Sequence, residues 1–447
     1  MRKMRDTGVE WIGEVPEGWE IGRIRSLFRE VSERYDAQSN NQLPLLSVSE
    51  YYGVAKREDK IKTGEVLVRA ESLDGYKVCR AGDIVSNIML AWTGALGVSP
   101  LSGIVSPAYS VYRPLKDVCS KYFHYLFRTD RYTDVFNKYS TGIIASRLRL
   151  YSPEFYAIPA IIPPLPEQRR IADYLDEKCA AIDGAVCELK RGIEDCKAWK
   201  KAIIFEAVTG KRRVGIFNAE KQSCREAEKM RPSGIPWIGE IPEGWRVMRL
   251  KHLIGILPGY AFKSEDFNFS NGIRLLRGIN VGVDSLRWDE CVYWDRVISE
   301  DLDRYQIQAG DLIVGLDRPW IEEGTRVCFA KKEDLPCLLV QRVCRIRTLG
   351  EMDLRIINYW LSSEAFERAL ACDTTGVSVP HISPYQIMEF RITLPSLPEQ
   401  RAIADYLDKK CAAIDAMVVE KEALIADLEA YKKSLIYETV TGKREVA

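Results

Sequence analysis

The sequence predicts a mixed α+β protein built from two similar halves, each a globular mixed α/β unit followed by one long helix. Two observations carry this prediction. The landmarks of the first half return in the second, and each half ends in a long stretch whose apolar residues recur every three or four positions. The composition supports sizeable cores, because 46% of the 447 residues are hydrophobic and 29% are charged.

The internal repeat has four landmarks that keep their order and nearly the same offset. They are WIGEVPEGW at 11–19 and WIGEIPEGW at 237–245, AGDIV at 81–85 and AGDLI at 309–313, Thr-Gly at 141–142 and 375–376, and the runs 163–212 and 395–444. Between these landmarks the halves share little. A shared frame with divergent inserts indicates two modules of one fold that recognise different things.

Residues 165–210 and 397–442 are predicted to form the long helices. Pro166 and Pro398 suit a first helical turn, and the glutamate after each suits the positive end of the helix dipole. The apolar residues follow a coiled-coil seam over about four heptads. They are Ile171, Leu175, Cys179, Ile182, Val186, Leu189, Ile193 and Cys196 in the first copy, and Ile403, Leu407, Cys411, Ile414, Val418, Ile425 and Leu428 in the second.

Gly210 and Gly442 stand where left-handed C-terminal caps are expected. Two helices with apolar seams are expected to pair within the chain, either as a simple hairpin or as a ruler between the globular units. The polar and charged stretch 213–232 is interpreted as a linker.

Within the globular units, β-branched and aromatic runs such as 84–85 and 105–112 predict strands, and residues 118–139 and 353–371 predict helices. The nine-residue WIGE elements contain too much Gly and Pro for a helix. We expect each to form a turn that leads into a strand, with both tryptophans packed.

The charge and cysteine content narrow the class of protein. Lys plus Arg equals Asp plus Glu, at 64 each, which argues against a chain coated in positive charge but allows a local basic stripe. No pair among the 12 cysteines has CxxC spacing, and there are only 3 histidines, so a zinc site has few candidate ligands. We expect reduced, buried thiols, for example Cys179 and Cys411, in a cytoplasmic protein. The sequence predicts no signal peptide and no membrane span.

A search for catalytic motifs finds none of the common ones. The sequence has no GxxxxGK[ST] loop, no GxGxxG opening a helix, no Asn/Asp-Pro-Pro-aromatic tetrapeptide of amino-methyltransferases and no Asp with Glu-x-Lys of restriction nucleases. It also lacks HExxH and a GxSxG elbow. The sequence therefore predicts a chain without catalytic activity of its own.

Basic and aromatic residues interleave in the divergent inserts. Arginine contacts phosphates or forms two parallel hydrogen bonds with guanine. Asn or Gln can form two hydrogen bonds with adenine. A solvated surface role is the simpler interpretation for any one of these residues. As a set beside a repeated frame, they are candidates for a surface that reads nucleic acid.

The landmarks occur twice in the same order, and in this they resemble the specificity subunits of type I restriction-modification systems. The resemblance covers essentially the whole chain. LPEQR at 165–169 and 397–401 opens each long helix, and VTGKR at 208–212 and 440–444 closes it. The Gly-x-x-Pro-x-Gly-Trp element and the Ala-Gly-Asp strand precede each helix.

The resemblance implies two target-recognition domains, 1–162 and 233–394, joined by antiparallel conserved helices at 163–212 and 395–447. Each domain would read one half of an asymmetric, bipartite site in double-stranded DNA, and the helices would set the gap. The subunit itself would hold no active site and no cofactor. It would recruit two modification subunits, which methylate adenine with S-adenosylmethionine, and two restriction subunits, which use ATP and Mg to translocate and cut DNA.

The predicted DNA-binding residues are Asn87, Arg147 and Arg149 in the first domain and Arg277, Arg318 and His381 in the second. Three other interpretations stay open. A coiled-coil scaffold joining two protein-binding domains would need no DNA and would give no salt-sensitive mobility shift. An unfamiliar nuclease would cut DNA with magnesium as the pure chain. A silent or alternative specificity subunit would be exchanged by recombination in the near-identical helices.

Overall fold

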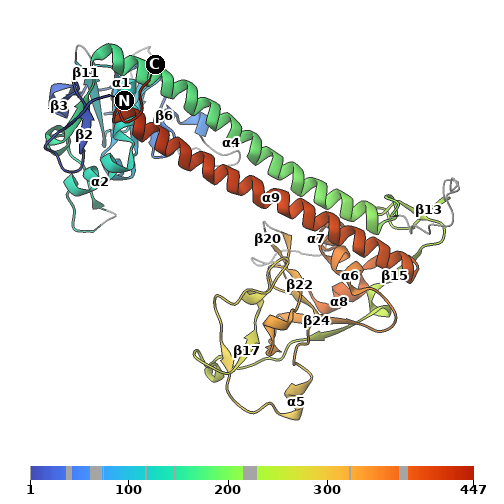
Figure 1. Ribbon diagram of the computed structural model, residues 1–447. Helices are drawn as coiled ribbons and strands as arrows, with labels where there is room; N and C mark the ends of the chain where they lie inside the picture. Colours follow the sequence, from blue (N-terminus) through green and yellow to red (C-terminus); the bar gives the residue numbers. More distant parts are fainter. Residues whose placement is uncertain are drawn as a thin grey trace. The chain divides into compact units, whose positions relative to one another are not determined.

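The computed structural model describes residues 2–36, 43–60, 73, 75–115, 118–144, 147–214, 229–321, 324–371 and 381–446. The chain divides into two compact units, Met1–Lys190 with Glu422–Ala447, and Arg191–Lys421. Each unit takes its globular part from one half of the sequence and its helical part from both long helices (Figure 1). The predicted mixed α+β fold is confirmed.

The first unit contains a four-stranded antiparallel sheet in the order β4-β11-β8-β9. Its strands are β4 (Phe28–Val31), β11 (Tyr109–Pro114), β8 (Ile84–Asn87) and β9 (Leu96–Val98). Four two-stranded pairs accompany it: β1 (Met4–Asp6) with β2 (Glu14–Pro16), β3 (Glu20–Arg23) with β12 (Pro159–Ile162), β5 (Leu46–Ser49) with β6 (Gly53–Lys56), and β7 (Lys77–Cys79) with β10 (Gly103–Val105). Three helices, α1 (Ser120–Phe127), α2 (Asp130–Tyr139) and α3 (Ser152–Ala157), share a core of buried aromatic rings with β4 and β11.

The second unit repeats this plan with a sheet in the order β16-β24-β19-β22. Its strands are β16 (Ile254–Pro258), β24 (Val343–Thr348), β19 (Leu312–Gly315) and β22 (Val327–Phe329). A three-stranded sheet adds β18 (Tyr293–Trp294), β17 (Ile273–Leu276) and β23 (Cys337–Leu339), and three pairs join β13 (Met230–Pro232) to β14 (Glu240–Pro242), β15 (Arg246–Arg249) to β25 (Arg391–Leu394), and β20 (Trp320–Ile321) to β21 (Gly324–Thr325). The helices are α5 (Glu300–Asp303), α6 (Leu354–Leu361), α7 (Glu364–Ala371) and α8 (Pro384–Glu389).

The Ala-Gly-Asp landmark anchors the same ion pair in both sheets. Asp83 is 2% exposed and accepts two hydrogen bonds from Arg113 of β11, at 3.1 and 2.9 Å. Asp311 is 4% exposed and is paired in the same two-bond fashion with Arg347 of β24. The hydrogen bonds to these aspartates raise the pKa of both arginines. The landmark therefore returns because each sheet encloses a carboxylate that its neighbouring strand must neutralise.

The long helices are α4 (Leu165–Val208) and α9 (Leu397–Val440), within two residues of their predicted ends. A buried glutamine of each LPEQR motif ties the helix start to its globular unit. Gln168 accepts from the Cys119 N–H at 2.9 Å and donates to the Pro163 carbonyl. Gln400 makes the matching bonds to Asp353 and Pro395.

The two helices pack against each other in antiparallel fashion, as predicted (Figure 1). In the second unit Lys200 Nζ lies 2.8 Å from Asp415 Oδ1, and in the first Lys432 Nζ lies 2.6 Å from Asp183 Oδ1. Such exposed pairs contribute at most about 1 kcal/mol each, so the apolar seam carries the pairing energy. Most of the predicted seam residues are buried, whereas Leu189, Val418, Ile425 and Leu428 are only partly buried.

Both VTGKR motifs end a helix against a tryptophan element. Gly210 and Gly442 have φ values of 76° and 74°, which confirms the predicted left-handed caps. Gly210 faces Pro242 and Trp245 in the second unit, and Gly442 faces Pro16 and Trp19 in the first. Trp19 is 2% exposed and Trp245 is 7% exposed, so the prediction that these tryptophans pack is also confirmed.

Alanine at Gly210 or Gly442 is expected to destabilise the protein by at least about 1–2 kcal/mol, the cost of a left-handed non-glycine residue. The new Cβ would also lie 2.5 Å from the Pro242 ring in the first case and still closer to the Pro16 ring in the second. Urea unfolding would measure the loss. Gly184→Ala is the matched control, because Gly184 lies within α4 with open space around it and should gain about 0.5–1 kcal/mol.

The predicted helices 118–139 and 353–371 are each two helices. The first breaks between α1 and α2 and the second between α6 and α7. At the breaks, the hydroxyls of Thr129 and Ser363 bond the carbonyls of Leu126 and Trp360 three residues earlier. Short polar side chains of this kind compete with the helical backbone pattern and favour a helix end.

The predicted cysteine burial is confirmed at both example positions. Cys179 is 5% exposed and Cys411 is 7% exposed. Burial raises the pKa of the Cys411 thiol to about 11, so the thiol stays protonated and unreactive near neutral pH.

His124 of α1 makes the first unit sensitive to mild acid. Its Nδ1 accepts from the Val98 N–H at 3.2 Å, which requires an unprotonated ring nitrogen. Burial and the nearby Arg128 lower its pKa to about 3. Since the folded pKa lies below the usual value of about 6.5, the unfolded chain binds more protons below that pH. Stability is therefore fully present above pH 6.5 and is lost as the pH falls towards 3.

Between pH 7 and pH 5 this histidine is expected to cost about 2 kcal/mol of stability. His124→Gln should flatten that part of the pH profile, as measured by urea unfolding at each pH. His252→Gln changes an exposed histidine and is the control. It should leave the wild-type dependence of the unfolding free energy on pH unchanged. An unchanged slope in His124→Gln would contradict this assignment.

Candidate nucleic-acid interface

In each unit, the loop after the second sheet strand in chain order (β8 or β19) meets the segment that follows the two short helices, α1 and α2 or α6 and α7. In the first unit the Leu150 N–H donates to the Ile88 carbonyl at 2.9 Å. In the second unit the Ile382 N–H donates to the Leu316 carbonyl, also at 2.9 Å. Two divergent segments thus come together at one edge of each sheet, where a variable surface is supported by a repeated frame.

The first unit presents Arg147 and Arg149 at this edge. Both are exposed, and Arg149 pairs with Thr141 across the neck of the loop. Gly142 allows this close approach, because a Cβ there would lie 2.5 Å from the Arg147 carbonyl oxygen. Ile143, which is fully exposed, projects from the same loop.

Asn87 is placed differently from the other predicted residues. Only 4% of its surface is exposed, and its side-chain oxygen accepts from the Met89 N–H at 3.2 Å. This bond shapes the turn at the end of β8, so the geometry gives Asn87 a structural role and does not support direct contact with DNA.

The second unit has a cavity of about 820 Å³ lined by arginines. They are Arg277, Arg287, Arg318, Arg326 and Arg342. Among the described residues of the lining, Asp317 is the one acidic residue. Two of the predicted residues, Arg277 and Arg318, therefore come together in one basic cavity.

Asp317 lies between a histidine and an arginine. Its Oδ1 is 2.6 Å from Nδ1 of His381, and its Oδ2 accepts from Nη1 of Arg342 at 2.8 Å. Burial alone would raise the pKa of this carboxyl, but the hydrogen bonds from His381 and Arg342 hold it below its usual value. Asp317 is thus an anion near neutral pH, and it links the predicted His381 to the cavity.

Two arginines of the cavity have strained backbones. Arg318 has φ 44° and Arg342 has φ 67°, and these are the positive φ values found for non-glycine residues in the described parts of the chain. Such conformations cost of order 1–3 kcal/mol each and cluster at functional sites. Both strained arginines line the same cavity and neighbour Asp317, one in the chain and one through a hydrogen bond. This makes the cavity the strongest candidate site.

The remaining arginines differ in how far they are already bonded. Arg326 donates to the carbonyls of Val281 and Asp317, and Arg277 donates to the Glu290 carbonyl. These two support loops of the cavity wall. Arg287 and Arg318 are exposed, and no partner is found for them among the described residues, so they can meet a ligand.

Sequence reasoning missed Asp317, Arg287, Arg326 and Arg342. A signal was present at Gln341, because a glutamine amide can form two hydrogen bonds with adenine and Gln341 lines the same cavity. Its neighbour Arg342 has no comparable sequence signal, because the carboxylate that it bonds belongs to Asp317, 25 positions away. Residues 372–380, which include the Thr375-Gly376 landmark, lie outside the described residues.

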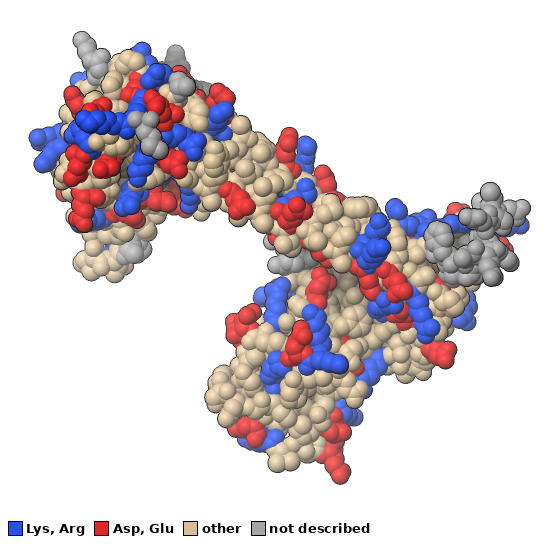
Figure 2. All heavy atoms as spheres, in the orientation of Figure 1, with Lys and Arg blue, Asp and Glu red and all other residues tan. Residues whose placement is uncertain are grey.

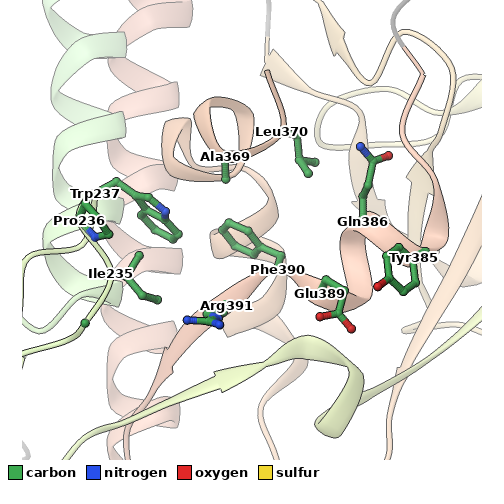
Figure 3. A pocket seen from close by; sticks show the side chains of 11 residues that line it. Ile235, Pro236, Trp237, Ala369, Leu370, Tyr385, Gln386, Glu389, Phe390 and Arg391 are labelled. Carbon is green, nitrogen blue, oxygen red and sulfur yellow. The ribbon is translucent and has the colours of Figure 1, made fainter. Parts of the chain in front are cut away.

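A smaller cavity of about 340 Å³ lies beside the second tryptophan element. Figure 3 shows the Trp237 and Phe390 rings facing each other, and they stack at 5.4 Å with an interplanar angle of 7°. Glu389 at its rim is already paired with Arg249 and Lys251. This cavity is therefore lined mainly by packing residues, and Arg391 is the one arginine named in its lining, against five in the larger cavity.

Charge is otherwise mixed on the visible surface. Figure 2 shows Lys and Arg interspersed with Asp and Glu on both units, in line with the equal totals of 64. Local clustering of arginine, as at the larger cavity, is therefore the informative feature. In the described residues no group of three or more His, Cys, Asp or Glu is arranged to hold a metal, and no helix is long and apolar enough to cross a membrane.

Comparison with known proteins agrees with these features. Residues 242–425 match the family model of the type I restriction modification DNA specificity domain. The MjaVIII specificity subunit of Methanocaldococcus jannaschii, a type I restriction enzyme subunit, is 28% identical over 97% of this chain and 94% of its own length. The EcoAI specificity subunit of Escherichia coli is 25% identical over 89% of this chain and 78% of its own.

Solved structures show the same fold. The HsdS subunit from Thermoanaerobacter tengcongensis aligns with a TM-score of 0.55 at 18% identity, over 98% of this chain and 100% of that one. A chain from a study of assembly and conformational transition of the type I R-M system aligns with a TM-score of 0.66 at 18% identity, over 96% and 99%. By its repeated landmarks, its domain match and relatives that align along nearly its full length, the chain is similar to the specificity subunits of type I restriction-modification systems.

Proposed function

We propose that this chain is the DNA-recognition subunit of a type I restriction-modification complex and that each unit reads one half of an asymmetric, bipartite site. The observation that carries the proposal is the arginine-lined cavity at the divergent edge of the second unit, within the residues that match the DNA specificity domain. Arginine supplies both phosphate contacts and base-edge hydrogen bonds. The corresponding edge of the first unit presents Arg147 and Arg149.

The chain recruits the catalytic partners of the complex. Two modification subunits transfer a methyl group from S-adenosylmethionine to adenine, and two restriction subunits use ATP and Mg to translocate and cut DNA. The target adenine must leave the base stack to be methylated, so the specificity subunit holds the modification subunit over a chosen base pair. The outer polar face of the α4–α9 pair is the proposed docking surface for the modification subunits.

Co-expression with the neighbouring methyltransferase gene, in a host that lacks adenine methylation, tests the proposal. Mapping methylated adenines across the genome should reveal one asymmetric motif with a fixed gap. If the two proteins co-purify but no motif emerges, the proposal fails and the scaffold interpretation replaces it. Magnesium-dependent cutting by the pure chain would instead support a nuclease.

A further inference from the structure

The cavity of the second unit has two chemically different kinds of arginine. Arg287 and Arg318 are exposed without a partner among the described residues. Arg342 is also exposed, with 70% of its side chain accessible, but one of its terminal nitrogens is bonded to Asp317. This difference determines which part of DNA each can bind.

A phosphate is a poor ligand for Arg342, because the Asp317 carboxylate lies 2.8 Å from its Nη1 and would repel a second anion close by. A base edge carries no net charge, so the same carboxylate does not oppose it. Asp317 restricts the rotation of the guanidinium and leaves its other N–H groups free. Guanine offers O6 and N7 as a pair of acceptors that suits two parallel bonds from one arginine.

The backbone supports the same assignment. Arg342 has φ 67°, in the left-handed region that a non-glycine residue rarely adopts. Its carbonyl accepts from the Leu316 N–H at 2.9 Å, which fixes it beside the loop that carries Asp317. His381 holds the other carboxylate oxygen at 2.6 Å. The carboxylate is thereby fixed from both sides, and the arginine it directs is held in a defined orientation.

We infer that Arg342 reads a guanine in the half-site of the second unit and that Asp317 is the positioning residue that aims it. This inference rests on the proposed function and adds to it the base that is read. His381 acts on the same base pair through Asp317.

The test uses the complete methyltransferase complex and the map of methylated adenines. Arg342→Ala is expected to lower discrimination at one G·C pair of one half-site by about 10- to 100-fold, with the gap and the other half-site unchanged. Arg342→Lys keeps the charge but loses the two-bond geometry, so it should relax the same pair. Asp317→Asn should relax that pair more weakly. The double variant should be no worse than Arg342→Ala, since both changes remove one interaction.

A matched control lies in the same unit. Arg296 and Asp266 form an exposed ion pair at 2.5 Å, with side-chain accessibilities of 59% and 26%, against 70% and 24% for Arg342 and Asp317. Neither residue lines the cavity, so Arg296→Ala and Asp266→Asn should leave the motif unchanged.

Three results would overturn the inference while leaving the proposed function in place. They are an unchanged motif in Arg342→Ala, a uniform loss of methylation with no relaxed position, and relaxation at an A·T pair. If the wild-type complex itself yields no motif, the proposed function fails, and the inference is overturned with it.

Discussion

Arg347→Ala is expected to lower the free energy of unfolding of the second unit by about 3–5 kcal/mol, the cost of leaving a buried charge without its partner. Asp311 is 4% exposed, and Nη2 of Arg347 bonds its Oδ2 at 2.8 Å. Among the described residues, the carboxylate would keep one bond, from the Gln308 N–H at 2.7 Å. Since typical domains are stable by only about 5–15 kcal/mol, this change should approach unfolding of the unit.

Denaturant unfolding measures the loss, and hydrogen exchange locates it in the β16-β24-β19-β22 sheet. A double change to Met at Arg347 and Leu at Asp311 should recover much of the stability, because it removes both charges. Arg368→Ala is the surface control. Arg368 and Glu364 are 76% and 43% accessible, so that change should cost less than about 1 kcal/mol. Equal losses in the buried and surface variants would refute the argument.

The same ion pair shows why so much of the fold follows from the sequence. The repeat can be recognised in the sequence because its landmark residues make contacts that few other residue types can make. Examples are the buried ion pair of Asp83, the hydrogen bonds of Gln168 and the tight helix end at Gly442. The coiled-coil seam is readable because helical periodicity places its residues on one face. What periodicity cannot give is a break such as that at Thr129, where a single side-chain bond ends the helix.

The binding edge is harder to predict for a physical reason. Arg277 and Arg318 were chosen by residue type, and the structure brings them to one cavity. Asn87 was chosen in the same way, yet it is buried because its side chain shapes a turn. Arg342 was missed because its environment comes from Asp317, 25 positions away. Residue type gives the chemistry that is available, whereas only the fold determines which groups meet.

The double variant Arg287→Ala/Arg318→Ala is expected to weaken DNA binding by the complex at least tenfold at 50 mM salt, and to do so for all sequences alike. Neither arginine has a partner among the described residues, and both line the cavity. Arg287 and Arg318 can therefore bind DNA phosphates. A phosphate attracts a cation from any direction and carries no sequence information. The loss should therefore appear in affinity and leave the methylation motif as it is.

Salt dependence separates this effect from base reading. Each phosphate contact contributes about 0.9 to the slope of log affinity against log salt, so losing two should reduce the slope by about 1.8. The affinity ratio of wild type to variant should then fall about tenfold between 50 and 200 mM salt. Arg296→Ala, which removes a cation already paired with Asp266, should leave the slope unchanged. If the double variant relaxes one base pair and keeps the wild-type slope, these arginines read bases, and the division of roles between them and Arg342 is wrong.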